Sequence, residues 1–230
     1  MGICSLTDGE KATITCPNRF MEGNRPLIDA ATLAFGAKQK FIAVPEVRLL
    51  EIVDPKGKKR KIGKVDFLLA KIEASQAVDF AALEIQSVYI TGDSIRPAFN
   101  KFLAEGVMAP EALRRADFRS SAQKRLMPQL GLKVPIFRRW GKHFFVAVDS
   151  TLFETLPHMR AQTPGNAEVT WLVYRFGHSS RGGFKIEDPE VRHTLWDDVL
   201  EALREGQPPE RGELLAQLSR QISRRHTFQT

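Results

Sequence analysis

Residues 81–90, Ala-Ala-Leu-Glu-Ile-Gln-Ser-Val-Tyr-Ile, constrain the fold most, because they are typical of a buried β-strand and yet contain a carboxylate. Side chains alternate between the two faces of a strand, so Glu84 and Gln86 share one face and the apolar residues beside them occupy the other. A buried ionised carboxylate is costly unless a cation compensates it. A second apolar run, residues 62–70, places Asp66 in the same unusual setting. We therefore expect two strands that each contribute one acid in need of a positive partner.

The length and composition are those of a compact soluble protein. With 230 residues and an apolar fraction of 43%, the chain can bury one sizeable core. No apolar run approaches the about 20 residues that a membrane helix needs, and the N-terminus lacks the basic-then-apolar pattern of a signal peptide. We therefore expect a cytoplasmic protein, in which the two cysteines are thiols or metal ligands rather than a disulfide.

Positive charge is concentrated in two places. The net charge is +7, and residues 114–142 contain nine basic side chains against the one acid Asp117. A second cluster, Lys-Gly-Lys-Lys-Arg-Lys, fills residues 56–61 at an expected hairpin turn. Either run alone is compatible with an ordinary solvated surface. Two such clusters on both sides of the acidic strands favour a polyanionic partner, because phosphates attract Lys and Arg and release counterions.

The order of the expected elements indicates an α/β fold. A helix over residues 26–36, ending at Gly36, precedes a long hairpin whose turn is Asp-Pro-Lys-Gly at residues 54–57. The sequence pattern predicts strands 41–53, 62–72 and 80–90, helices 97–115 and 120–130, strands 143–148 and 169–176, and helices 189–204 and 208–224. We expect these elements to form a mixed central β-sheet flanked by helices.

This arrangement resembles the common core of the PD-(D/E)xK nuclease superfamily. Asp66 on the second strand corresponds to the first acid of the motif, and Glu84-Ile85-Gln86 on the third strand to (D/E)-x-K, with Gln86 in place of the usual lysine. Adjacent strands lie about 4.8 Å apart, so facing acids can share a divalent cation that polarises a phosphate and activates a water. Mg²⁺ suits carboxylates and retains waters, so it is the cation we expect on Asp66 and Glu84. Glu46, on the first strand, is a further candidate acid.

The chain is more specifically similar to the NotI-type restriction endonucleases, over nearly its whole length. The likeness is carried by Gly-Ile-Cys-Ser (2–5), Ile-Thr-Cys-Pro-Asn-Arg-Phe (14–20), Val-Asp-Phe (65–67), Leu-Glu-Ile-Gln (83–86), residues 120–130, Trp-Gly-Lys (140–142) and residues 169–174. The resemblance implies metal-dependent hydrolysis of double-stranded DNA at a short specific site, as in type II restriction. It also implies a use for Gln86, since NotI-type enzymes look to employ the same amide, which can orient an attacking water.

The cysteines depart from that family. NotI-type enzymes look to hold an iron atom with four N-terminal cysteines in two pairs, and Cys4 and Cys16 match only the second pair. Four thiolates suit a tetrahedral structural site, whereas two leave half of the coordination empty. Either the true start lies upstream of Met1 or the metal has been lost, so structural iron or zinc is expected only if missing ligands are supplied. We divide the chain into a remnant of that metal-binding segment, residues 1–25, and a nuclease domain, residues 26–230.

Together these features predict a site-specific DNA endonuclease. In this hypothesis Asp66 and Glu84 bind Mg²⁺, Gln86 positions the attacking water and Glu46 is an auxiliary acid. The candidate DNA-binding residues are Arg119, Lys124, Arg125, Lys133, Arg138, Arg139 and Lys142. A palindromic site favours a two-fold homodimer, because symmetric subunits match symmetric half-sites.

Two rival hypotheses belong to other classes. The first is a catalytically silent DNA-binding module on a nuclease fold, which binds DNA without cutting it. The second is a repair or junction nuclease, which has the same acids but recognises DNA structure rather than sequence. Cleavage products distinguish all three.

Overall fold

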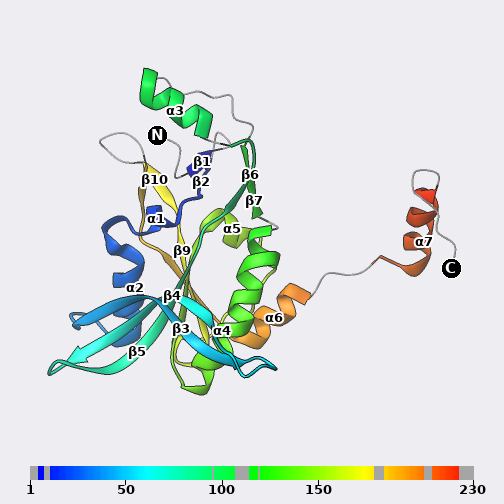
Figure 1. Cartoon of the computed structure of the whole chain (residues 1–230). Coiled ribbons are helices and arrows are strands. Elements are labelled where there is room, and N and C mark those ends of the chain that lie inside the picture. The colour runs from blue at the N-terminus through cyan, green and yellow to red at the C-terminus, as the bar shows by residue number, and fades with distance from the viewer. Residues whose placement is uncertain are drawn as a thin grey trace.

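A six-stranded mixed β-sheet forms the centre of the computed structural model (Figure 1), which describes residues 5–7, 11–94, 96–106, 114–118, 120–178, 184–204 and 209–222. Across the sheet the strands lie in the order β12 (Glu190–Thr194), β9 (Val169–Tyr174), β8 (Phe144–Asp149), β5 (Gln76–Gln86), β4 (Lys59–Glu73) and β3 (Phe41–Val53). The neighbours β5, β8 and β9 run parallel, and the other pairs are antiparallel. The predicted α/β fold with a mixed central sheet is therefore confirmed.

Helices cover both faces of this sheet. One face packs against α4 (Met127–Arg139), α5 (Ser150–Glu154) and α6 (Trp196–Arg204), and the other against α1 (Pro17–Phe20) and α2 (Arg25–Phe35). Alternate residues of β8 contribute to the two cores: Phe144 and Val146 to the first, Phe145 and Ala147 to the second. Because β8 is buried on both sides, its residues 144–148 form a continuous apolar run rather than an alternating one.

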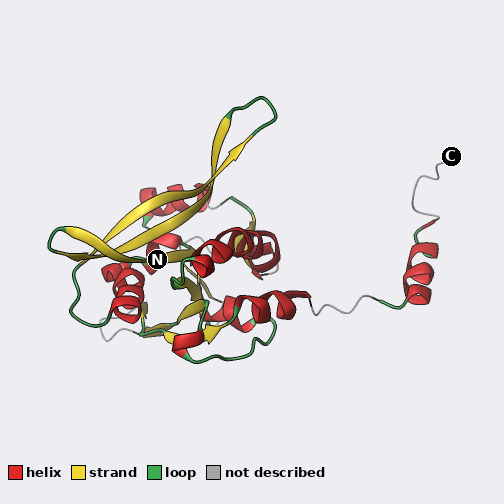
Figure 2. Cartoon of the chain, turned by 90° about the horizontal axis from the view of Figure 1, so that it is seen from below, coloured by secondary structure: helices red, strands yellow, loops and turns green. Residues whose placement is uncertain are grey.

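The long hairpin of β3 and β4 has the predicted turn. Asp54 accepts backbone hydrogen bonds at its Oδ1 from Lys56 (3.0 Å) and Lys58 (2.9 Å), and Gly57 adopts the φ of +76° that the turn requires. β4 pairs with β3 as far as Lys59, but with β5 only from Phe67 onward. The two-stranded ribbon therefore projects beyond the body of the protein (Figure 2). The lysines at its tip, Lys56, Lys58 and Lys59, are exposed.

Smaller elements complete the described chain. The two-stranded sheets are β1 (Ser5–Thr7) with β2 (Ala12–Ile14), β6 (Tyr89–Gly92) with β7 (Arg114–Asp117), and β10 (Phe176–His178) with β11 (Phe184–Ile186). The remaining helical segments are η1 (Glu22–Asn24), α3 (Arg96–Glu105), a π-helix η2 (Ser120–Leu126), η3 (Pro164–Asn166) and α7 (Arg211–Ser219), which buries none of its residues.

Two predicted elements near the acids differ from the structure. The strand expected over residues 80–90 is β5, which ends at Gln86, and the chain then leaves the sheet to form the separate strand β6. The helix expected over residues 97–115 ends at Glu105, because the residues from Arg114 pair with β6 as β7. Pairing between segments far apart in the chain decides both cases, and local periodicity does not report it.

Four later predictions need similar corrections. The helix expected over residues 189–204 begins only at Trp196, since residues 190–194 pair with β9 as β12. The helix expected over residues 120–130 opens with the π-helix and continues through Pro135 to the end of α4. The strand expected over residues 169–176 ends at Tyr174, and the last helix is shorter than residues 208–224. The helix near residues 26–36 and the strand 41–53 are confirmed.

Residues before position 25 contribute to the second core. Ile14 and Phe20 are fully buried there beside α2, and Phe20 packs edge-on against Tyr174 with ring centroids 5.9 Å apart. The division of the chain at residue 25 remains a prediction from the sequence. Among the helices within the described ranges, none has the length and apolar character needed to cross a membrane.

Candidate active site

Asp66 and Glu84 come together where β4 and β5 part. The last backbone pair between these strands is Phe67 with Leu83, so the two acids lie one residue beyond it. Each carboxylate then faces the backbone of the other strand. The Ile85 amide donates to Asp66 Oδ2 at 2.8 Å, and the Asp66 amide lies 3.5 Å from Glu84 Oε2. The side-chain oxygens thus contact amides that have no partner in the regular strand pairing. The two acids occupy facing positions of the two strands, near enough for the charge of Asp66 to act on Glu84.

Glu84 is the more deeply buried of the two acids. Its residue is 2% exposed, on the face of β5 that packs against α4, and Lys133 of that helix contacts it with Nζ 2.6 Å from Oε1. Burial and the neighbouring charge of Asp66 raise the pKa of Glu84 to about 7, although Lys133 acts in the opposite direction. The site therefore contains two acidic groups that repel each other and one buried cation.

Lys133 was assigned from the sequence to a DNA-binding strip, but the structure places it inside the protein. Its side chain is 5% exposed, in the same inward stripe of α4 as Leu130, Val134 and Phe137. The sequence does indicate this inward-facing position, because Lys133 lies three residues after Leu130 and four residues before Phe137, the spacing of residues on one face of a helix. A count of positive charges along the segment does not reveal that spacing.

Gln86 and Glu46 flank the two acids. Gln86 is 7% exposed, and its Nε2 donates to the carbonyl oxygen of Ser87 at 2.8 Å. Glu46 lies on β3 between the residues that pair with Phe67 and Val65, so it is opposite Asp66, with a φ of +59°. Its side chain is exposed and accepts a 2.5 Å contact from Lys64, which lowers the pKa of the carboxylate. Glu46 is therefore near Asp66 along the sheet but is engaged with a lysine.

The remaining candidate DNA-binding residues fall into three groups. Lys124, Arg125 and Arg139 are exposed, and the Arg125 guanidinium stacks on the ring of Tyr89 at 3.3 Å from its centroid. Two others contact acids of the same chain: Arg138 binds Glu168 (2.7 Å) and Asp197 (3.2 Å), and Lys142 binds Asp79 (2.5 Å). Arg119 lies outside the described residues.

A buried acid that the sequence analysis missed, Asp149, ends β8 next to the strand that bears Glu84. It accepts hydrogen bonds from the Ile14 amide at 2.9 Å, the Thr151 amide at 2.8 Å and the Thr151 hydroxyl. Burial raises its pKa. Asp149 caps the N-terminus of α5 through the Thr151 amide and joins β2 to the sheet through the Ile14 amide. Both of its carboxylate oxygens are therefore occupied by structural hydrogen bonds, and we do not count it as a metal ligand.

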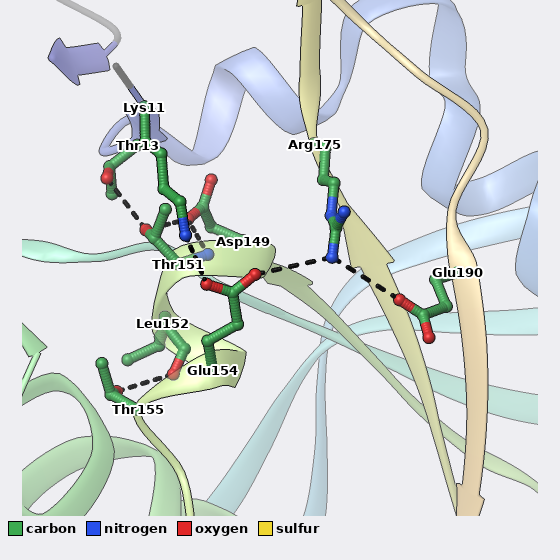
Figure 3. A network of polar contacts seen from close by, with 9 residues as sticks. All are labelled: Lys11, Thr13, Asp149, Thr151, Leu152, Glu154, Thr155, Arg175 and Glu190. Carbon is green, nitrogen blue, oxygen red and sulfur yellow. Dashed lines mark hydrogen bonds and ion pairs between the residues drawn. The ribbon is translucent and has the colours of Figure 1, made fainter. Parts of the chain in front are cut away.

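The surface around Asp149 continues as a network of charges (Figure 3). Glu154 lies between Lys11 and Arg175, at 2.9 and 3.5 Å, and Arg175 also approaches Glu190 at 3.8 Å. A cavity of about 420 Å³ borders this network and is lined by both signs of charge, including Glu154, Arg175, Glu190 and Arg192. Neither Asp66 nor Glu84 lines it, so the cavity is separate from the paired acids.

Of the two cysteines, Cys4 lies outside the described residues. Cys16 is a half-buried free thiol immediately before α1. Among the described residues there is also no group of three or more His, Cys, Asp and Glu side chains able to hold a metal ion. The expectation that Cys4 and Cys16 hold structural iron or zinc only if the missing ligands are supplied therefore stays a prediction.

Comparison with known protein families identifies a match over most of the chain. The family described as Restriction endonuclease NotI matches residues 4–186, which include β4, β5, α4 and all the acids discussed above as candidate metal ligands. A search of curated proteins finds no match for the chain.

Proposed function

Because the chain belongs to the NotI family of restriction endonucleases and is thus a DNA endonuclease, we propose that it cuts double-stranded DNA at a specific site with Mg²⁺ held by Asp66 and Glu84. One observation carries the metal assignment: the two acids occupy facing positions where β4 and β5 part, with the Ile85 amide on Asp66 and Lys133 on Glu84. The placement of the chain in the PD-(D/E)xK superfamily is part of the same proposal.

The donor set fits Mg²⁺. This ion takes one or two protein carboxylates and completes its shell with waters and phosphate oxygens. Two adjacent acids, one of them buried with its pKa raised to about 7, are the charge arrangement that a divalent cation relieves. When bound, Mg²⁺ supplies Lewis-acid activation of the phosphate and of a water.

The residues of the chain then have separate roles. Asp66 and Glu84 hold the cation, and their backbone and lysine contacts fix the orientation of both carboxylates. Gln86 orients the attacking water with its side-chain amide. To do so, the amide must give up its hydrogen bond to the Ser87 carbonyl oxygen. Glu46 serves as an auxiliary acid, which requires that its carboxylate leave Lys64.

The exposed cations supply phosphate contacts. Lys124, Arg125 and Arg139 are available on the surface, and the lysines at the tip of the β3–β4 ribbon extend the basic surface beyond the sheet. A two-stranded ribbon is also narrow enough for the major groove of DNA. A homodimer on a palindromic site and a cytoplasmic location complete the proposal.

The proposal is tested by incubating the protein with DNA of mixed sequence and Mg²⁺ and sequencing the ends produced. We expect discrete cut sites. Nicks at branched or damaged structures would favour a repair nuclease, and intact DNA with retained binding would favour a silent DNA-binding module.

Two variants connect the cutting to the acids. Glu84→Gln should abolish cleavage and leave most DNA binding intact, since it removes a metal ligand while preserving shape. Glu73→Gln is the matched control, because Glu73 is an exposed carboxylate on β4 that contacts Lys71. Cleavage by Glu84→Gln at the wild-type rate would refute the catalytic assignment.

A further inference from the structure

Lys133 and Glu84 form an ion pair in the interior of the protein. Their side chains are 5% and 3% exposed, and Nζ lies 2.6 Å from Oε1. Burying two charges is unfavourable compared with packing apolar side chains of similar volume, so an ion pair in this position contributes little to stability as such. The surrounding positions of α4, Leu130, Val134 and Phe137, are apolar. A role beyond folding accounts better for a lysine in this stripe.

The geometry of the pair assigns different tasks to the two oxygens of Glu84. Oε1 accepts from Lys133, whereas Oε2 is the oxygen turned toward the Asp66 amide, at 3.5 Å. The ammonium therefore determines which oxygen faces the helix and which faces Asp66. A surface contact to DNA phosphate, the role indicated by the charge pattern, needs an exposed ammonium group, and Lys133 does not have one.

We propose that Lys133 is a positioning residue of the nuclease site: it holds one oxygen of Glu84 so that the other is presented on the Asp66 side, where the divalent cation binds. This inference rests on the proposed function. In this arrangement the positive charge of the site comes from Lys133 on α4. The strand β5 provides none, because Gln86 is neutral and its amide donates to a backbone carbonyl. A group that holds a metal ligand in place strengthens metal binding without touching the metal.

The test is Mn²⁺ binding to the DNA-free protein, measured by calorimetry, together with DNA affinity in the absence of divalent metal. Lys133→Met should lower Mn²⁺ affinity by about 10–100-fold, the usual effect of removing a group that supports a metal ligand. Metal-free DNA affinity should change by less than about twofold, because the side chain is not on the surface. The matched control is Lys124→Met, the same substitution at an exposed position, which should weaken metal-free DNA binding and leave Mn²⁺ affinity unchanged.

The possible results of these measurements each bear on the role of Lys133. Unchanged Mn²⁺ affinity in Lys133→Met, or a loss of metal-free DNA affinity like that of Lys124→Met, overturns the role of Lys133. If Lys133→Met does not fold, Lys133→Arg and Lys133→Gln are compared instead. The charged arginine variant should bind Mn²⁺ at least about tenfold more tightly than the neutral glutamine variant. Equal affinities of the two variants overturn the proposal. A wild-type protein that binds no Mn²⁺ overturns this inference, and one that also fails to cut DNA with Mg²⁺ overturns the proposed function as well.

Discussion

The raised pKa of Glu84 leads to a prediction about the stability of the metal-free protein. An acid whose pKa is higher in the folded than in the unfolded state binds its proton more tightly when folded, so folding is favoured below the unfolded value and loses that advantage as the pH rises through the folded value. For Glu84 the window runs from pH 4.5 to about 7. With one pKa unit equal to about 1.4 kcal/mol, the unfolding free energy should fall by up to about 3 kcal/mol across this window.

The measurement is urea denaturation in EDTA over a series from about pH 5 to about pH 8, for the wild type and Glu84→Gln. The glutamine variant keeps the size of the side chain and has no proton to lose. The difference between the two curves cancels contributions from the other titrating groups, such as Asp149, whose pKa burial also raises. We expect the wild type to lose stability relative to the variant as the pH rises.

Two further conditions identify the cause of the shift. Asp66→Asn removes the neighbouring charge and should reduce the loss, since that charge is the second cause of the raised pKa after burial. Excess Mg²⁺ should restore stability at high pH, because a ligand that binds only the folded state stabilises it. A difference curve that stays flat across the window would contradict a raised pKa, since it would mean that contact with Lys133 keeps Glu84 as easily ionised as in the unfolded chain.

Three more predictions concern DNA binding and the fold. Lys124→Ala and Arg125→Ala should each weaken binding to all DNA sequences. The slope of log affinity against log salt concentration, measured by filter binding over a salt series, should fall by about 0.9 for each phosphate that is no longer neutralised. An unchanged slope would exclude a phosphate contact at that position. Asp149→Ala should destabilise the protein by about 1–3 kcal/mol in urea, because it leaves the buried Ile14 amide without its acceptor, and a negligible change would contradict that role. Phe137→Ala should cost about 3–5 kcal/mol in the same assay, since the ring is fully buried; a loss below about 1 kcal/mol would show that α4 packs loosely on the sheet.

The sequence predicted those parts of the fold that local pattern controls. The strand 41–53, its hairpin turn and the helix that ends at Gly36 carry their signals within a few residues. The alternation along β5 likewise predicted that Glu84 faces away from the core that contains Leu83. Each of these features depends on neighbours in the chain.

The misassigned parts depend on partners far away in the chain. β7 and β12 are short, charged segments that form strands by pairing with β6 and β9, and they contain too few apolar residues for a clear strand pattern. The burial of Lys133 depends on the packing of α4 against β5, although its place between apolar residues was an available clue. The structural role of Asp149 could not be predicted from the local sequence, because its partner, the Ile14 amide, is 135 residues away.

In the proposed function Asp66 and Glu84 share a divalent cation. The most direct test is a crystal structure of the protein with DNA and Mn²⁺, in which anomalous scattering locates the metal. We expect a peak between the two carboxylates, within coordination distance of an oxygen of each and on the side of Glu84 away from Lys133. Mn²⁺ found elsewhere, with Asp66 and Glu84 in contact only with the protein, would contradict it.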